Sequence, residues 1–129
     1  MVALSYFGKA RRDHVTDDAF FCYACARLSG FLWADWFTLP KDNPAQALFR
    51  IRLGAAAGAM ENSAGLYLRR FAKGLVTVNP TDAAKSVEVK IGPGRRLKDV
   101  YTGAPLSVRG SKVALALPPQ SGRVFVHVD

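Results

Sequence analysis

A succession of short alternating segments after residue 65 constrains the fold of this chain more than any other feature. Residues 86–91 (SVEVKI) alternate strictly between polar and apolar, which predicts a strand with one buried and one solvated face. Similar patterns predict strands over 66–71, 75–78, 97–101, 112–117 and 123–128. Turn-forming pairs separate these strands: Lys73-Gly74, Asn79-Pro80, Gly92-Pro93, Thr102-Gly103, Arg109-Gly110 and Ser121-Gly122.

Short strands joined by short turns are typical of an antiparallel sheet that closes on itself or doubles into a sandwich. No helical pattern interrupts the strands, which argues against a parallel doubly wound sheet. Two turns have a local explanation. Gly74 allows the positive φ of a tight hairpin. Asn79-Pro80 ends a strand, because proline cannot donate to the ladder and the asparagine side chain can close an Asx turn.

One helix is predicted from Thr16 to Ser29. Thr16 suits the N-cap position, and Asp17 and Asp18 place negative charge on the first turn, where the helix dipole favours it. Residues 19–26 (AFFCYACA) are apolar on nearly every side, so the helix must be covered on more than one face. Burying each large side chain stabilises by about 1.5–3 kcal/mol, and we therefore expect the chain to associate in solution.

The region between helix and strands is mixed in character. Residues 31–37 (FLWADWF) are dense in aromatics, the stretch from Lys41 to Ala45 predicts a surface loop, residues 48–53 a short strand, and residues 54–65 a loop. We predict a mainly β fold, an antiparallel β-sandwich-like domain over 48–129, preceded by a short N-terminal helical segment over 1–47.

The length limits what else the chain can contain. With 129 residues it is too short for a complete eight-fold barrel, which needs at least about 200 residues. No apolar run approaches the roughly 18–20 residues of a membrane span, so no membrane partner is expected. The basic residues near the start follow a short apolar stretch, the reverse of a secretory signal. No targeting peptide is predicted, and the compartment stays open.

The net charge of +8 admits two interpretations. A small basic β-rich module could bind nucleic acid or another polyanion, with an affinity that falls steeply with salt. However, the basic residues are spread in pairs such as Arg11-Arg12 and Arg95-Arg96 rather than in one block. That spacing favours a solvated surface.

Four motifs resemble a known family in their order. Residues 65–81 (GLYLRRFAKGLVTVNPT) form a strand, a glycine turn and a return strand, residues 97–103 read LKDVYTG, residues 112–117 alternate, and residues 118–128 read PPQSGRVFVHV. Together they resemble the β domain that follows the catalytic barrel in many glycoside hydrolases, in particular the glycosyl-hydrolase-like families and, more loosely, the α-amylase clan. The likeness covers about 53–129, and residues 17–37 more faintly resemble the end of a barrel.

The resemblance implies a C-terminal accessory domain of a glycoside-hydrolase-like protein, a carbohydrate partner and no cofactor. The family's catalytic acids lie on barrel strands, and no motif here matches them, so we expect no hydrolysis by the chain alone. The apolar helix would contact either a second copy of the chain or the missing barrel. An independent small enzyme remains a third hypothesis, which a deep carboxylate-lined pocket would favour.

Five residues are candidate carbohydrate contacts. Asp35 is the one acid that stands between aromatic residues suited to a sugar ring, although aromatics in β domains more often belong to the core. The candidates are Trp33, Asp35, Trp36, Tyr67 and Tyr101.

The pair Cys22 and Cys25 has the CxxC spacing of redox and zinc sites. The pair falls inside the helix rather than at its start, and only His14 and His127 could complete a zinc site. We therefore predict small hydrophobic side chains here and no metal site.

Overall fold

Strands dominate the computed structural model, which describes residues 2–5, 15–35 and 39–128. The largest sheet has the order β3-β4-β5-β10-β7, formed by Glu61–Ser63, Leu66–Phe71, Gly74–Asn79, Ser121–Val128 and Arg96–Asp99. A second sheet has the order β6-β9-β8, formed by Lys85–Lys90, Lys112–Leu117 and Val108–Arg109. Neighbouring strands in both sheets are antiparallel, which confirms the predicted mainly β, sandwich-like fold.

A different kind of unit precedes the antiparallel sheets. Strands β1 (Val2–Ser5) and β2 (Leu32–Asp35) pair in parallel, and helix α1 (Val15–Leu28) connects them. This is a β-α-β crossover, the connection that parallel strands require. The helix agrees with the predicted one, and β2 lies within the aromatic stretch 31–37. The parallel pairing itself was not predicted.

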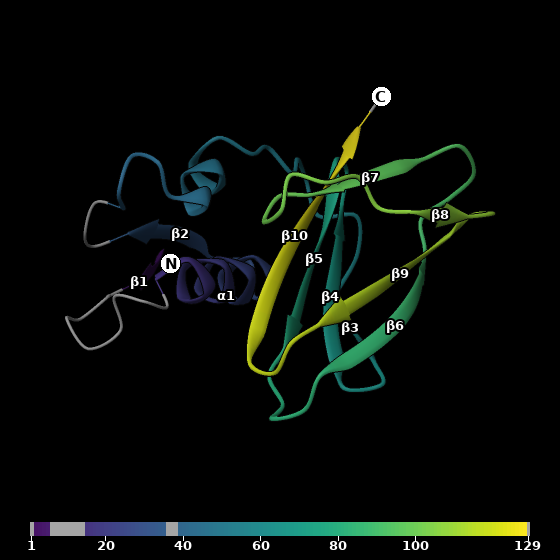
Figure 1. The fold of residues 1–129 in the computed structure, drawn as a ribbon, viewed down its shortest axis with the longest axis horizontal. Helices are drawn as coiled ribbons and strands as arrows, with labels where there is room; N and C mark the ends of the chain where they lie inside the picture. Colours follow the sequence, from purple (N-terminus) through teal and green to yellow (C-terminus); the bar gives the residue numbers. More distant parts are fainter. Residues whose placement is uncertain (1, 6–14, 36–38, 129) are drawn as a thin grey trace.

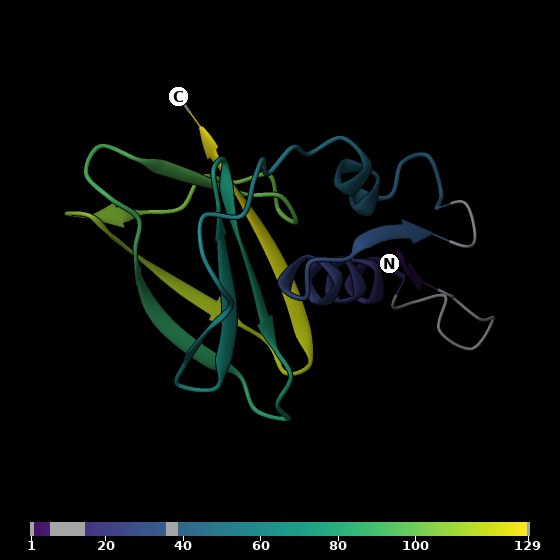
Figure 2. The same ribbon diagram turned by 180° about the vertical axis from the view of Figure 1, so that it is seen from behind.

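The five-stranded sheet is the middle layer of the molecule. Helix α1 lies on one of its faces and the sheet β6-β9-β8 on the other (Figures 1 and 2). The core therefore has two parts. Toward α1 the sheet presents Val76, Val78 and Val124, and toward the second sheet it presents Leu75 and Phe125. Every residue of β5 is buried, because this central strand is covered on both faces.

The apolar helix is largely covered by its own chain. Its buried residues are Ala19, Phe20, Tyr23, Ala24, Ala26 and Leu28. They belong to the core shared with β5 and β10 or pack against the neighbouring elements. Thr16 lies within the helix rather than capping it, and its hydroxyl donates to Asn43 Oδ1 at 3.2 Å. Phe21, Cys22 and Cys25 remain partly exposed.

Two glycines allow close approach rather than a tight turn. A Cβ at Gly122, in β10, would lie 2.8 Å from the carbonyl oxygen of Phe20 and 2.9 Å from Cα of Phe21, so α1 approaches the sheet at this point. Gly74 was predicted to supply a positive φ, and this was wrong. It lies in β5, where a Cβ would collide with the carbonyl oxygen of Phe125 and with Leu53.

The strand predicted over residues 48–53 is also wrong. Residues Pro44–Phe49 form a 3-10 helix, η2, and the chain from 50 to 54 has no regular structure apart from a turn. The cause is local capping: Asn43 Oδ1 accepts a hydrogen bond from Ala45 N at 2.8 Å, and Pro44 is the first residue of the 3-10 helix. Strands β1, β3 and β8 have no clear alternation in sequence and were not predicted.

The Asx turn predicted at Asn79 is confirmed. Asn79 Oδ1 accepts from Thr81 N at 3.0 Å, and Nδ2 donates to the carbonyl oxygens of Ala83 and Pro118 at 2.8 and 2.9 Å. The fully buried amide thus joins the ends of β5 and β9.

Candidate functional site

The five predicted carbohydrate contacts do not all gather in one place. Trp33, in β2, packs edge-on against Tyr23 with 5.6 Å between ring centroids and lies 4.9 Å from the ring of Phe49. Its half-buried indole therefore forms part of the packing around α1. Asp35 is the last residue of β2, and Trp36 lies outside the described residues. Asp35 therefore stands at the carboxyl end of β2.

Tyr67 lies on β4, where it pairs with Asn62 on one side and Val78 on the other. It is half-buried and packs against the core between the sheet and α1. Tyr67 does not line the polar pocket described next, so it and Tyr101 are separate candidates.

Tyr101 joins the β domain to the start of the helix. It follows β7, and its hydroxyl donates to Asp17 Oδ1 at 2.7 Å. The ring meets Phe20 edge-on at 4.9 Å between centroids, and the guanidinium carbon of Arg123 lies 3.9 Å from the ring centroid. One face is therefore occupied by a cation–π contact. The hydrogen bond to Asp17, together with burial, raises the pKa of Tyr101, so the hydroxyl stays protonated at neutral pH.

A polar pocket surrounds this hydroxyl. Its volume is about 350 Å³, and it is lined by Asp17, Asp18, Tyr101, Pro118, Pro119, Gln120, Ser121 and Arg123. The lining combines carboxylates, hydroxyls, an amide and a guanidinium. Such a set both donates and accepts hydrogen bonds, as sugar hydroxyls require. The volume is in the lower part of the roughly 300–1,000 Å³ range of small-molecule sites.

Sequence reasoning found Tyr101 but missed the partners that make a pocket around it. Asp17 and Asp18 are explained by the helix dipole alone, and Asp17 is 84 residues from Tyr101. The turn at 118–121 carries no chemical motif. The pocket arises because Gly122 lets the start of β10 approach α1.

The cysteine pair does not have the properties of a redox site. Both thiols are free, and burial followed by the neighbouring Cys22 raises the pKa of Cys25 to about 11. A thiol with that pKa is almost entirely protonated at neutral pH and is a poor nucleophile.

Among the residues that the structure describes, no group of three or more His, Cys, Asp or Glu side chains could hold a metal ion. No helix in the described part is long and apolar enough to cross a membrane.

No protein-family model matches the chain, and no curated protein matches it in sequence. Several solved structures share its fold. An α-galactosidase I from Mortierella vinacea aligns with 88% of this chain and 36% of its own, with a TM-score of 0.60 at 11% identity. An α-amylase from Anoxybacillus aligns with 93% of this chain and 34% of its own, with a TM-score of 0.59 at 13% identity.

A GH27 β-L-arabinopyranosidase from Geobacillus stearothermophilus aligns with 86% of this chain and 30% of its own, with a TM-score of 0.57 at 7% identity. The chain thus spans about a third of the length of each of these glycoside hydrolases. Residues 48–129 make up about 64% of the chain (82 of 129). Matches of 86% to 93% therefore extend into the N-terminal segment as well.

Proposed function

We propose that this chain is the C-terminal accessory β domain of a glycoside-hydrolase-like protein, together with the adjoining end of its barrel. The supporting observation is the extent of the fold likeness, which covers both the antiparallel sheets and part of the β-α-β unit. The three enzymes act on different glycosides by name. What they have in common supports a carbohydrate-related role and leaves the sugar to be identified by experiment.

The β-α-β unit supports the proposal that this chain adjoins a barrel. Within the described residues β1 pairs only with β2, so the parallel sheet has two strands. Parallel strands normally lie inside larger sheets that are covered on both faces, and a barrel needs eight of them. Further strands beside β1 or β2 would complete this sheet. The partly exposed Phe21 and Cys22 of α1 add apolar surface on the same unit.

The polar pocket at Tyr101 is the proposed carbohydrate contact. A glycosidase holds two carboxyl groups on either side of one bond, about 5–5.5 Å apart for retention and farther apart for inversion. Asp17 and Asp18 are consecutive on a helix and do not face each other, and Asp17 is held by the Tyr101 hydroxyl. The pocket therefore suits binding of sugar hydroxyls rather than cleavage.

Titration of the purified chain with maltotriose, galactose and L-arabinose, followed by amide chemical shifts, tests the contact. We expect shifts at Tyr101 and Gln120, and about fivefold weaker binding in Tyr101→Phe, which loses one hydroxyl. Tyr67→Phe is the matched control because it removes the same group outside the pocket. Binding lost in Tyr67→Phe and kept in Tyr101→Phe would move the contact to β4.

Two further measurements test the accessory role. We expect the purified chain alone to hydrolyse none of a panel of glycosides. Measurable turnover that disappears when Asp35 or Glu61 is replaced would instead show that the chain is an enzyme. The coding DNA upstream of Met1 should encode a barrel in the same frame. A stop codon directly upstream would remove that part of the proposal.

The same kind of titration distinguishes a polyanion-binding module from the proposed carbohydrate-binding domain. An oligonucleotide that binds with steep salt dependence, while saccharides cause no shifts, would replace the carbohydrate proposal.

A further inference from the structure

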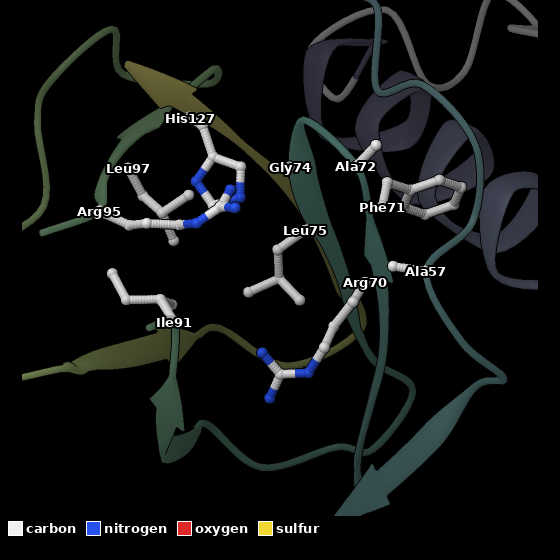
Figure 3. A pocket seen from close by; sticks show the side chains of 10 residues that line it. All are labelled: Ala57, Arg70, Phe71, Ala72, Gly74, Leu75, Ile91, Arg95, Leu97 and His127. Atoms are coloured by element: carbon white, nitrogen blue, oxygen red, sulfur yellow. The ribbon is translucent and has the colours of Figure 1, made fainter. Parts of the chain in front are cut away.

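A second pocket lies at the opposite end of β10 from the polar pocket at Tyr101. Its volume is about 270 Å³. Its lining comes from β4, β5, β7 and β10 of the five-stranded sheet, from Ile91, which follows β6, and from Ala57, Ala72 and Arg95, which lie outside the strands. The pocket therefore opens at one end of the core between the two antiparallel sheets. Figure 3 shows its side chains.

The pocket has a basic rim. Arg95 and His127 lie together on one side and Arg70 lies on the other, with Leu75 between them (Figure 3). None of the residues that line it is an aspartate or glutamate. A neighbouring pocket of about 240 Å³ shares Arg95 and His127 and adds Arg96, which extends the positive charge along the edge.

The arginines differ in how their charges are used. Arg70 is partly neutralised, because its Nε lies 3.1 Å from Glu61 Oε2 and it also donates to the carbonyl oxygen of Lys90. Arg95 is exposed and makes no hydrogen bond or ion pair within the described part of the chain. Its charge is thus available to a ligand.

His127 adds an unused polar atom. Its Nδ1 is shielded from solvent and has no hydrogen-bond partner among the described residues. A shielded polar nitrogen without a partner costs free energy unless a further group satisfies it. Burial, followed by the charge of Arg95, lowers the pKa of His127, and a hydrogen bond with the backbone of Arg96 opposes this shift, so the imidazole is mainly neutral at pH 7. The neutral ring therefore lines the pocket beside Arg95 without repelling that charge.

The floor of the pocket is apolar. Leu75, Ile91 and Leu97 line it and are at most 9% exposed, because they close this end of the core. An apolar floor with a few convergent polar groups is the usual composition of a small-molecule site. The volume lies just below the roughly 300–1,000 Å³ of sites for drug-sized molecules, which indicates an occupant of about one sugar ring.

We propose that this basic pocket binds an anionic molecule the size of a monosaccharide, a hexuronate or a sugar phosphate, with its acidic group against Arg95 and His127 and one ring face on the apolar floor. The guanidinium supplies charge-assisted hydrogen bonds to carboxylate or phosphate oxygens. This pocket shares no residue with the polar pocket at Tyr101, so each proposal can fail without the other.

Titrations at low ionic strength with glucuronate, glucose 6-phosphate, glucose and inorganic phosphate test the proposal, with amide shifts as the readout. We expect shifts at Leu75, Leu97 and His127 with at least one acidic sugar, and its identity distinguishes carboxylate from phosphate. Arg95→Gln should weaken that binding about tenfold, the loss of one charged hydrogen bond. Arg109→Gln removes the same charge from an exposed position in β8 outside the pocket and should leave it unchanged.

Four results would overturn the proposal. Glucose binding as tightly as both acidic sugars would show that the charge is irrelevant. Inorganic phosphate binding as tightly as glucose 6-phosphate would show that the ring makes no contact. Equal loss in Arg95→Gln and Arg109→Gln, or shifts that avoid Leu75 and Leu97, would show general attraction to a basic surface.

Discussion

Replacing Gly122 by alanine should disrupt the contact between helix α1 and the five-stranded sheet. The added Cβ would lie 2.8 Å from both Ala24 Cβ and the Phe20 carbonyl oxygen, and 2.9 Å from Phe21 Cα. Two of these atoms belong to the helix backbone. They cannot rotate away as a side chain can, so the helix itself must shift.

The magnitude follows from overpacking. Extra methyl groups in a filled core typically cost about 1–3 kcal/mol. The upper end applies here because the obstruction is backbone and because Phe20 and Ala24 are fully buried. A loss of about 3 kcal/mol corresponds to a decrease in Tm of roughly 10–15 °C for a domain of this size.

Thermal and urea unfolding of Gly122→Ala, followed by circular dichroism, measure this loss. Gly58→Ala is the matched control, because a Cβ at Gly58 meets nothing within 4 Å, and its stability should change by less than about 0.5 kcal/mol. Two outcomes would refute the reasoning: Gly122→Ala unfolds at the same urea concentration as the parent, or Gly122→Ala and Gly58→Ala lose the same free energy of unfolding. In either case the close approach at Gly122 does not hold the helix to the sheet.

Four further results are expected. Asn79→Ala should lose about 3 kcal/mol in urea unfolding, because it removes the Nδ2 hydrogen bonds to the carbonyl oxygens of Leu117, which is buried, and of Pro118; a loss below 1 kcal/mol would contradict this. The raised pKa of Tyr101 means that its contribution is present below its ordinary value of 10.0 and is lost as the pH rises through the folded-state pKa. Tyr101→Phe should therefore flatten the decrease of Tm in that alkaline range, and an unchanged profile would refute the link to Asp17. The lowered pKa of His127 means that stability is lost as the pH falls below 6.5, and His127→Gln should reduce that loss. The parallel sheet has only two strands within the described residues, and Phe21 and Cys22 stay partly exposed beside it, so sedimentation should show association of the chain; a monomer at high concentration would contradict it.

Local patterns accounted for most of the antiparallel fold. The apolar positions of β6 and β9 recur every second residue, and this period alone decides which of their side chains face the core. Helix α1 and the Asx turn at Asn79 were predictable for the same reason, because their signals lie within a few residues.

The errors arose where a distant segment decides the conformation. Gly74 reads as a turn glycine, yet it is needed because Leu53 and Phe125 lie where its Cβ would be. Strands β1 and β3 are short and acquire their structure by pairing with β2 and β4. Residues 48–53 alternate like a strand, but the Asn43 cap starts a 3-10 helix just before them.

The candidate sites depend even more on the tertiary structure. Tyr101 was singled out from its sequence, whereas its hydrogen bond to Asp17 joins residues 84 positions apart. Arg70, Arg95 and His127 come from separate strands and turns, and nothing in their sequence neighbourhoods indicates a shared pocket. The sequence by itself determined the longer antiparallel strands, the helix and the fold class, because alternation and apolar runs act over a few residues. Only the tertiary structure decided which charges meet, because that depends on how closely the helix and the sheets pack.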